Sequence, residues 1–191
     1  MSGLYCALVH HPVRDREGAE VTTSVTNLDV HDIARAARTY GLRGYFVVTP
    51  ITAQHALVER IVDHWRSGAG AWRVPERGEA LSLVRVLHSV AAARAEVAAR
   101  EGVEPRVVGT AARRPAGVEI RSFGDLAVEL AESAVPHLIL FGTGHGMTAE
   151  LLATCDVVLE PIRGDSDYNH LSVRAAAAIV LDRLVSGGAG R

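Results

Sequence analysis

The residues best suited to contact a small molecule lie in a glycine-rich turn, LFGTGHGM, which follows an apolar run. Its three glycines are Gly142, Gly144 and Gly146. Glycine tolerates positive φ and lets a backbone approach a ligand closely, so this turn could present backbone groups to a bound molecule. The turn is not a dinucleotide fingerprint, because Met147 replaces the third glycine, and no Lys-Ser/Thr pair follows as in a P-loop. On its own the turn leaves ligand binding and a tight structural turn both open.

Two further segments place unusual chemistry after apolar runs. In VVGTAARRP, Gly109 and Thr110 are followed by the adjacent pair Arg113 and Arg114, which suits either a solvated surface or a phosphate clamp. In LEPIRGDSDYNHLSV, Glu160 follows a third apolar run, and a polar stretch then leads into an alanine-rich segment. The aspartates at 165 and 167 lack the further oxygen ligands that calcium needs, so we predict no metal site.

Alternating strand and helix patterns position these segments. We expect apolar strands at residues 4–11, 44–50 and 156–162, and strands that run into loops within residues 106–112 and 137–146. Helices follow the strands, including one long helix over residues 79–100. Continuous apolar strands alternating with helices predict an α/β fold, a mostly parallel sheet covered by helices on both faces. We expect one domain over residues 1–191. In such sheets ligands bind at the carboxyl ends of strands, which is where the three segments fall.

Composition restricts the location of the protein and its partners. The formal net charge is −2, so the overall charge does not indicate nucleic-acid binding, although all 20 basic residues are arginine. The sequence contains no recognisable signal peptide and no apolar run long enough to cross a membrane. Cys6 and Cys155 lie in or beside apolar runs without partners, as buried thiols do in a reducing compartment. We therefore expect a cytoplasmic protein without a membrane partner.

The segments GTGHGM, LEPI and YNHLSVRAAAAI together resemble the carboxyl-terminal half of the SPOUT-class RNA methyltransferases. Upstream, NLDVHDIARAARTYG is similar to the first motif of the ribose-methylating branch of that class, with Asn27, Ile33, Arg35, Ala37 and Tyr40 at matching positions. The overall likeness is closest to bacterial proteins similar to the carboxyl-terminal domain of tRNA (guanine-N1) methyltransferases. The resemblance covers residues 27–50 and 106–184 and leaves the expected long helix unexplained.

The resemblance implies an α/β domain with a carboxyl-terminal trefoil knot, a homodimer, and S-adenosylmethionine bound by three loops. The alanines at 175–178 would allow close backbone approach where the last helix passes through a loop of the chain, and the polar residues before them would line the cofactor. The cofactor-binding residues implied in this way are Val108, Gly109, Thr110, Phe141, Gly142, Thr143, Gly144, Gly146, Leu159, Pro161, Ile162, Tyr168, Asn169, His170, Leu171 and Val173.

The resemblance also implies an RNA substrate, tRNA or rRNA rather than DNA, and roles for several charged residues. Arg35 would act near the cofactor site of the partner protomer, where an always-protonated guanidinium suits phosphate positioning, and Glu160 could accept a proton. Ser172 and Arg174 stand where the ribose-methylating branch commonly has Asn and Ser, so base and ribose both remain open as targets. The candidate RNA-binding residues are Arg113, Arg114, Arg163 and Arg174.

Two other functions are compatible with the residues. A knotted protein that binds S-adenosylmethionine without methylating RNA, in a regulatory role or with a small-molecule substrate, is favoured by the negative net charge and the missing basic appendage. An ordinary nucleotide-binding α/β protein without a knot is disfavoured, because no complete phosphate-binding motif is present.

Overall fold

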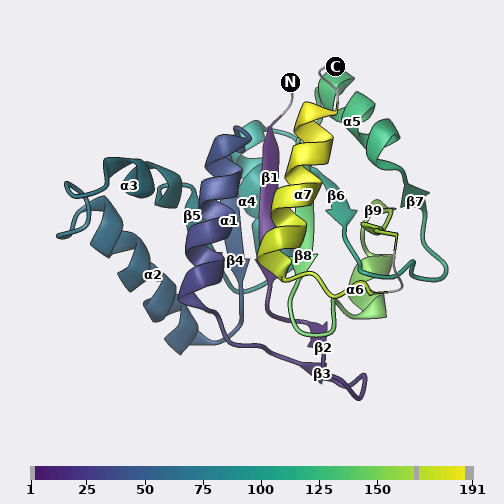
Figure 1. Ribbon diagram of the computed structural model, residues 1–191, viewed down its shortest axis with the longest axis horizontal. Helices are drawn as coiled ribbons and strands as arrows, with labels where there is room; N and C mark the ends of the chain where they lie inside the picture. Colours follow the sequence, from purple (N-terminus) through teal and green to yellow (C-terminus); the bar gives the residue numbers. More distant parts are fainter. Residues whose placement is uncertain (1–2, 166–167, 188–191) are drawn as a thin grey trace.

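Seven parallel strands form a single sheet in the order β5-β4-β1-β8-β6-β9-β7 (Figure 1). The computed structural model describes residues 3–165 and 168–187. In that part of the chain no helix is long and apolar enough to span a membrane. The strands are β1 (Leu4–Val9), β2 (Val13–Arg14), β3 (Glu20–Val21), β4 (Gly44–Val48), β5 (Val84–Leu87), β6 (Arg106–Gly109), β7 (Ile120–Arg121), β8 (His137–Gly142) and β9 (Val157–Leu159). The helices are α1 (Asn27–Thr39), α2 (Thr52–Arg66), α3 (Pro75–Leu81), α4 (Val90–Glu101), α5 (Phe123–Glu132), α6 (Ala149–Ala153) and α7 (Val173–Ser186).

Both faces of the sheet are buried under helices, as the non-alternating strands predict. In β1 every residue is buried. Leu4, Cys6 and Leu8 pack into a core shared with α1, α2, α3, α5 and α7, whereas Tyr5 and Val9 pack into a second core with α4 and α6. The predicted α/β fold with a parallel sheet is therefore confirmed. The antiparallel pair β2–β3 lies outside the main sheet, in the segment between β1 and α1.

Helix α1 begins at an N-cap residue, Thr26, and presents two different faces. Thr26 accepts a hydrogen bond from the backbone N–H of Asp29 at 3.2 Å, and its hydroxyl donates to the Asp29 carboxylate at 2.6 Å. The helix buries Val30, Ile33, Ala34 and Ala37 against the sheet and ends before Gly41, which has φ +73°. Residues 27, 31 and 35 are four positions apart, so they share the face that remains toward α2.

Helix α7 lies between α1 and α5 on one face of the sheet (Figure 1). Its start is fixed by Ser172, whose hydroxyl oxygen accepts a hydrogen bond from the Ala175 N–H at 3.2 Å. Ala177 is fully buried, and the other alanines of the run are half-buried. Small side chains let α7 sit close to its neighbours, which is the role that we expected for the alanine run.

The prediction of one long helix over residues 79–100 is wrong. The chain forms α3, strand β5 and then α4 over this range, and β5 pairs with β4 as an edge strand of the sheet. Ser89 caps α4 by accepting from the Ala92 N–H at 3.1 Å, so a new helix starts after the strand. The apolar spacing that suggested one helix also fits a short strand between two helices, because β-branched Val84 and Val86 favour a sheet once a partner strand is present.

Candidate functional site

The three chemically unusual segments meet at one edge of the sheet. They follow β6, β8 and β9, which are adjacent and parallel, with Gly109 in register with both Leu140 and Val158. Just past this edge, the Thr110 hydroxyl donates to the Leu140 carbonyl at 2.8 Å. The predicted meeting of the three loops at the carboxyl ends of neighbouring strands is confirmed.

The glycine turn is tightly folded and is hydrogen-bonded to the segment around Arg14 of the same chain. A Cβ at Gly142 would lie 2.8 Å from the Met147 nitrogen, and Gly144 and Gly146 have φ +58° and +96°. The Arg14 N–H donates to the Gly146 carbonyl at 2.9 Å, and the His145 N–H donates to the Arg14 carbonyl at 3.0 Å. Only glycine allows this geometry without displacement of the backbone.

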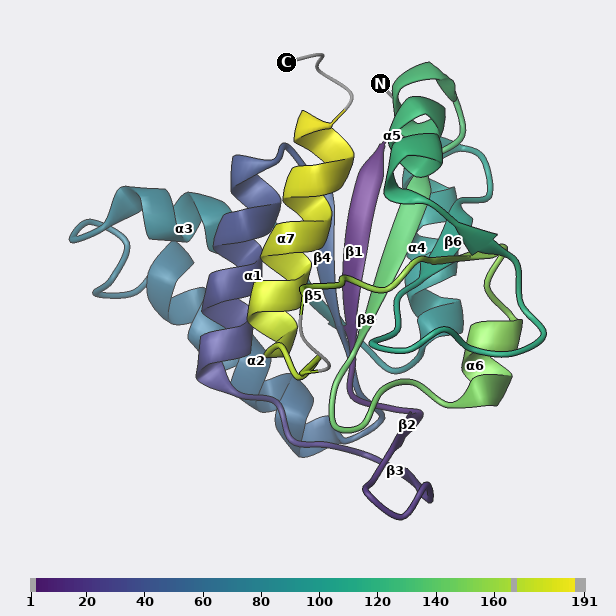
Figure 2. The ribbon, with the colours of Figure 1, turned by 45° about the vertical axis from the view of Figure 1, so that its right-hand side comes forward.

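The third loop joins β9 to α7 and contacts the first loop. Figure 2 shows its yellow-green first part crossing the molecule toward α7. The Asn169 side-chain N–H donates to the Ala112 carbonyl at 2.6 Å, so the first and third loops are tied together. Tyr168, His170 and Leu171 are exposed beside this bond, with the Tyr168 and His170 ring centroids 5.3 Å apart. The start of α7 is therefore polar and open, as expected. Asp167 lies outside the described residues.

The predicted cofactor residues fall into two groups that could contribute differently. Val108, Phe141 and Leu159 have side chains buried in the core, and Gly109 is buried as well, so only the backbone of these residues could face a ligand. The remainder lie in the loops, at the end of β8 or at the start of α7, and are half-buried or exposed. These are Thr110, Gly142, Thr143, Gly144, Gly146, Pro161, Ile162, Tyr168, Asn169, His170, Leu171 and Val173.

The two candidate catalytic residues lie in different places. The Glu160 carboxylate accepts a hydrogen bond from the Phe123 N–H at 2.8 Å, which caps the start of α5. Arg35 is exposed on α1 and lines a cavity between α1, α2 and α3 that contains no residue of the three loops. Within one chain the two side chains therefore do not form a common site.

The four candidate RNA-binding arginines also differ. Arg113, Arg114 and Arg163 are exposed, and no ion pair involves them in the described part of the chain. Arg174 instead contacts the carboxylates of Asp29 at 3.2 Å and Asp32 at 3.5 Å, which joins α7 to the first turns of α1. Arg174 therefore has two structural partners on α1.

His10, a buried histidine for which we predicted no role, is connected through Thr23 to Thr143 of the glycine turn. His10 Nδ1 lies 3.0 Å from the Thr23 hydroxyl, which contacts the Thr143 hydroxyl, and that hydroxyl donates to the Val9 carbonyl at 3.0 Å. Each hydroxyl has one proton, so the chain requires His10 Nδ1–H to donate to Thr23 and Thr23 to donate to Thr143. Burial lowers the pKa of His10 from its ordinary value of 6.5 to about 4. Only the pairing of β1 with β8 reveals this arrangement.

The His10 network should make stability depend on pH. The folded-state pKa of about 4 lies below the ordinary 6.5, so the unfolded chain binds more protons between these values. The free energy of unfolding should fall as pH drops from 6.5 to 4, with about 3 kcal/mol of that fall due to His10. Urea titrations at several pH values should show a correspondingly smaller fall in His10→Gln, in which the titrating group is absent. An equal fall in both proteins would contradict the assignment.

Within the described residues, no three His, Cys, Asp or Glu side chains are grouped as metal ligands.

The fold as a whole is that of the SpoU-type methyltransferases. The SpoU methyltransferase AviRb from Streptomyces viridochromogenes, solved with the cofactor AdoMet, matches with a TM-score of 0.59 at 18% identity, over 98% of this chain and 60% of that one.

A family model described as SAM-dependent RNA methyltransferase matches residues 3–186, and the chain belongs to this family. It is 46% identical over 182 residues to a tRNA (guanine-N(1)-)-methyltransferase of Oleidesulfovibrio alaskensis, covering 95% of this chain and 42% of that protein. It is also 41% identical over 183 residues to an uncharacterised protein of Aquifex aeolicus, covering 96% and 88%. The chain thus spans less than half the length of the tRNA methyltransferase that it matches. The predicted family is confirmed, and its description names both S-adenosylmethionine and RNA.

Proposed function

We propose that this chain acts as a cytoplasmic homodimer that transfers a methyl group from S-adenosylmethionine to a nucleotide of tRNA. The observation that carries the proposal is the meeting of three loops at adjacent strand ends in a member of an RNA methyltransferase family. The choice of tRNA over rRNA is supported by the 46% identity to a tRNA methyltransferase. The cytoplasmic location is supported by the free thiols of Cys6 and Cys155.

The three loops fit a ligand that is held mainly by backbone groups. At Gly142 a side chain would collide with the Met147 backbone, and at Gly109 it would lie 3.0 Å from Leu152 and 3.1 Å from Cys155. The hydrogen bond from the Asn169 side chain to the Ala112 carbonyl holds the third loop against the first. When bound, S-adenosylmethionine supplies a methyl group on a positively charged sulfur. The loops orient the ligand for in-line displacement, and such alignment can supply several kcal/mol of the barrier reduction.

The position of Arg35 supports a dimeric site. Because Arg35 lines a cavity without any residue of the three loops, it can serve the methyl-transfer site only if a second protomer brings the two together. There its guanidinium would hold a phosphate of the RNA and so position the nucleophile. Glu160 is close to the cofactor loops but is bound to Phe123, so its first role is to fix the end of β9 and the start of α5.

We also propose that the segment between β9 and α7 threads through the loop between β6 and β7, which would create the trefoil knot. Strands β6 and β7 both pair with β9, so the loop between them leaves and returns beside that strand. The Asn169 bond to Ala112 connects the threading segment to this loop.

Transfer of labelled methyl groups tests the proposed function. Purified protein should transfer label from S-adenosylmethionine to unmodified tRNA and not to rRNA, and native gels should show a dimer. Binding of S-adenosylmethionine and its demethylated product without transfer to either RNA would instead favour the knotted binding protein with another substrate. Transfer to rRNA alone would retain the enzyme class and reject tRNA.

A further inference from the structure

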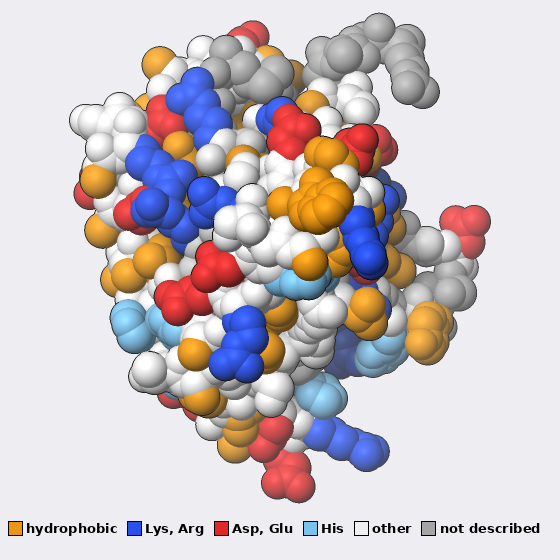
Figure 3. Space-filling view, turned by 90° about the vertical axis from the view of Figure 1, so that its left-hand side faces the viewer, with side chains coloured by type: hydrophobic (Ala, Val, Ile, Leu, Met, Phe, Trp, Pro, Cys, Tyr) orange, Lys and Arg blue, Asp and Glu red, His pale blue; other side chains and the backbone are white. Residues whose placement is uncertain are grey.

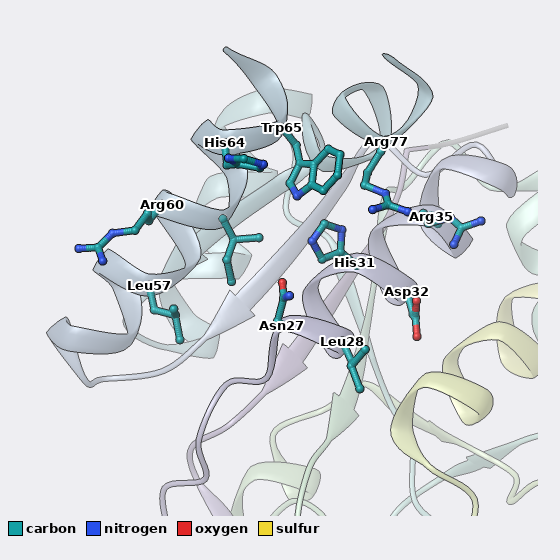
Figure 4. A pocket seen from close by; sticks show the side chains of 11 residues that line it. Asn27, Leu28, His31, Asp32, Arg35, Leu57, Arg60, His64, Trp65 and Arg77 are labelled. Atoms are coloured by element: carbon teal, nitrogen blue, oxygen red, sulfur yellow. The ribbon is translucent and has the colours of Figure 1, made fainter. Parts of the chain in front are cut away.

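A cavity of about 590 Å³ opens between α1, α2 and α3, away from the three loops (Figure 4). Trp65 and His31 lie in its middle, with Arg77 and Arg35 to one side and Arg60 to the other. This volume is in the range of small-molecule pockets and is large enough for a nucleotide. The lining residues are Asn27, Leu28, His31, Asp32, Arg35, Leu57, Arg60, Ile61, His64, Trp65 and Arg77.

The cavity is rich in cationic groups that the protein itself does not neutralise. Across the described residues, no carboxylate lies within ion-pair distance of Arg35, Arg60 or Arg77. The only acidic residue in the lining, Asp32, contacts Arg174 at 3.5 Å. Figure 3 shows arginine and histidine side chains spread over this side of the molecule, among apolar and acidic ones.

Trp65 fixes one of these cations in place. The Arg77 guanidinium lies 4.4 Å from the centre of the indole ring, a cation–π contact, and the His31 ring meets the same indole edge-on at 5.6 Å. Gly70 packs on the indole so closely that a Cβ there would lie 2.6 Å from Trp65 Cε3. The indole is therefore clamped, and it holds Arg77 at the cavity instead of offering a free stacking surface.

His31 adds an unsatisfied polar atom to the same cavity. Its Nδ1 is buried without a hydrogen-bond partner. Burial and then the nearby Arg77 guanidinium lower the pKa of His31. Exposed Leu28 and Leu57 border the cavity and could pack against a sugar or base. An anionic ligand with an apolar part would satisfy the arginines, the imidazole and the leucines together.

We propose that this cavity binds a nucleotide of the RNA substrate next to the methylated one, with its phosphates held by Arg60 and Arg77. This inference rests on the proposed function. The cavity adjoins Arg35 on α1, so a strand whose target nucleotide lies in the partner's cofactor site would pass directly over it. Arginine binds phosphate through paired N–H groups. A nucleotide therefore fits this cavity better than an acidic protein surface, which would have to supply carboxylates and also cover Leu28 and Leu57.

Removal of the two cations should weaken RNA binding without affecting the cofactor. In the double variant Arg60→Ala/Arg77→Ala, the Kd for tRNA should rise about 10-fold or more. The slope of log K against log salt should become shallower by about 1.4 to 1.8 for the two lost phosphate contacts. Filter binding at several salt concentrations measures both, and calorimetry should show unchanged affinity for S-adenosylmethionine. Arg60→Ala alone keeps the Trp65 clamp and should give about half the slope change.

Arg66→Ala is the matched control, because Arg66 ends the same helix, is exposed and does not line the cavity. RNA affinity equal in Arg66→Ala and the double variant would overturn the cavity assignment while the proposed function stands. Dissociation of the dimer in the double variant, seen by sedimentation, would overturn it in favour of a second protomer in the cavity. Failure of the wild-type protein to bind any RNA would remove the proposed function as well.

Discussion

Replacement of Gly142 by alanine should raise the Kd for S-adenosylmethionine by about 10- to 100-fold. The added Cβ would lie 2.8 Å from the Met147 nitrogen and 2.9 Å from Met147 Cγ, so the turn must open to accept it. Overpacking of this kind costs about 1–3 kcal/mol, and each 1.4 kcal/mol corresponds to a factor of ten in affinity. Because the strain lies in the turn that holds the cofactor, the loss should appear in binding.

Calorimetric titration with S-adenosylmethionine measures this effect, and thermal unfolding shows whether the variant remains folded. Gly124→Ala is a suitable control, because a Cβ there meets only the Ser122 hydroxyl at an ordinary 3.9 Å. Gly144→Val should act in the same direction, since Gly144 has φ +58° and a Cβ would lie 3.0 Å from the Arg14 carbonyl oxygen. Wild-type affinity in a folded Gly142→Ala protein would place the cofactor elsewhere.

Alanine at Arg35 should lower methyl transfer by about 100- to 1000-fold, the usual effect of removing one group that stabilises the reacting arrangement. Affinity for S-adenosylmethionine should not change, because in the proposed dimer the Arg35 guanidinium holds a phosphate of the RNA and does not bind the cofactor. Arg38→Ala, one turn further along α1, is the control: Arg38 pairs with Glu79 and does not line the cavity. Normal turnover in Arg35→Ala would remove the catalytic assignment.

Co-expression of Arg35→Ala with Gly142→Ala tests whether the site is shared between protomers. At an S-adenosylmethionine concentration near the wild-type Kd, each variant alone should have little activity. In a heterodimer, the intact loops of one protomer meet the intact arginine of the other, so roughly a quarter of the wild-type activity should return if half of the dimers are mixed. No recovery in co-purified heterodimers would show that Arg35 serves the loops of its own chain.

The parts of this molecule that repeat a local pattern could be predicted from the sequence. The apolar runs before Gly109, Gly142 and Glu160 predicted strands, and the meeting of the loops that follow them results from parallel pairing. Ser122 caps the start of α5 and Gly102 follows the end of α4, and a sequence can mark such ends because caps depend on neighbouring residues only.

What depends on distant contacts could not be predicted. Val84 to Leu87 became a strand because β4 was available beside it, and the sequence around residue 84 contains no sign of that partner. The same holds for His10, whose hydrogen bonds to Thr23 and Thr143 require β1 to lie next to β8. The cavity around Trp65 likewise requires α3 to fold back against α1 and α2.

The location of β1 between β4 and β8 also determines how the chain must fold as it leaves the ribosome. One edge of β1 can pair with β4 early, whereas the other waits for His137 and the residues after it. At about 5–20 residues per second, the roughly 90 residues from β4 to β8 take roughly 5–20 s to synthesise. During that time the backbone N–H and C=O groups on one edge of β1, a strand that the finished fold buries completely, are open to pairing with other nascent chains. Slow translation between residues 48 and 137 should therefore increase aggregation, and chaperones that shield β1 should prevent it.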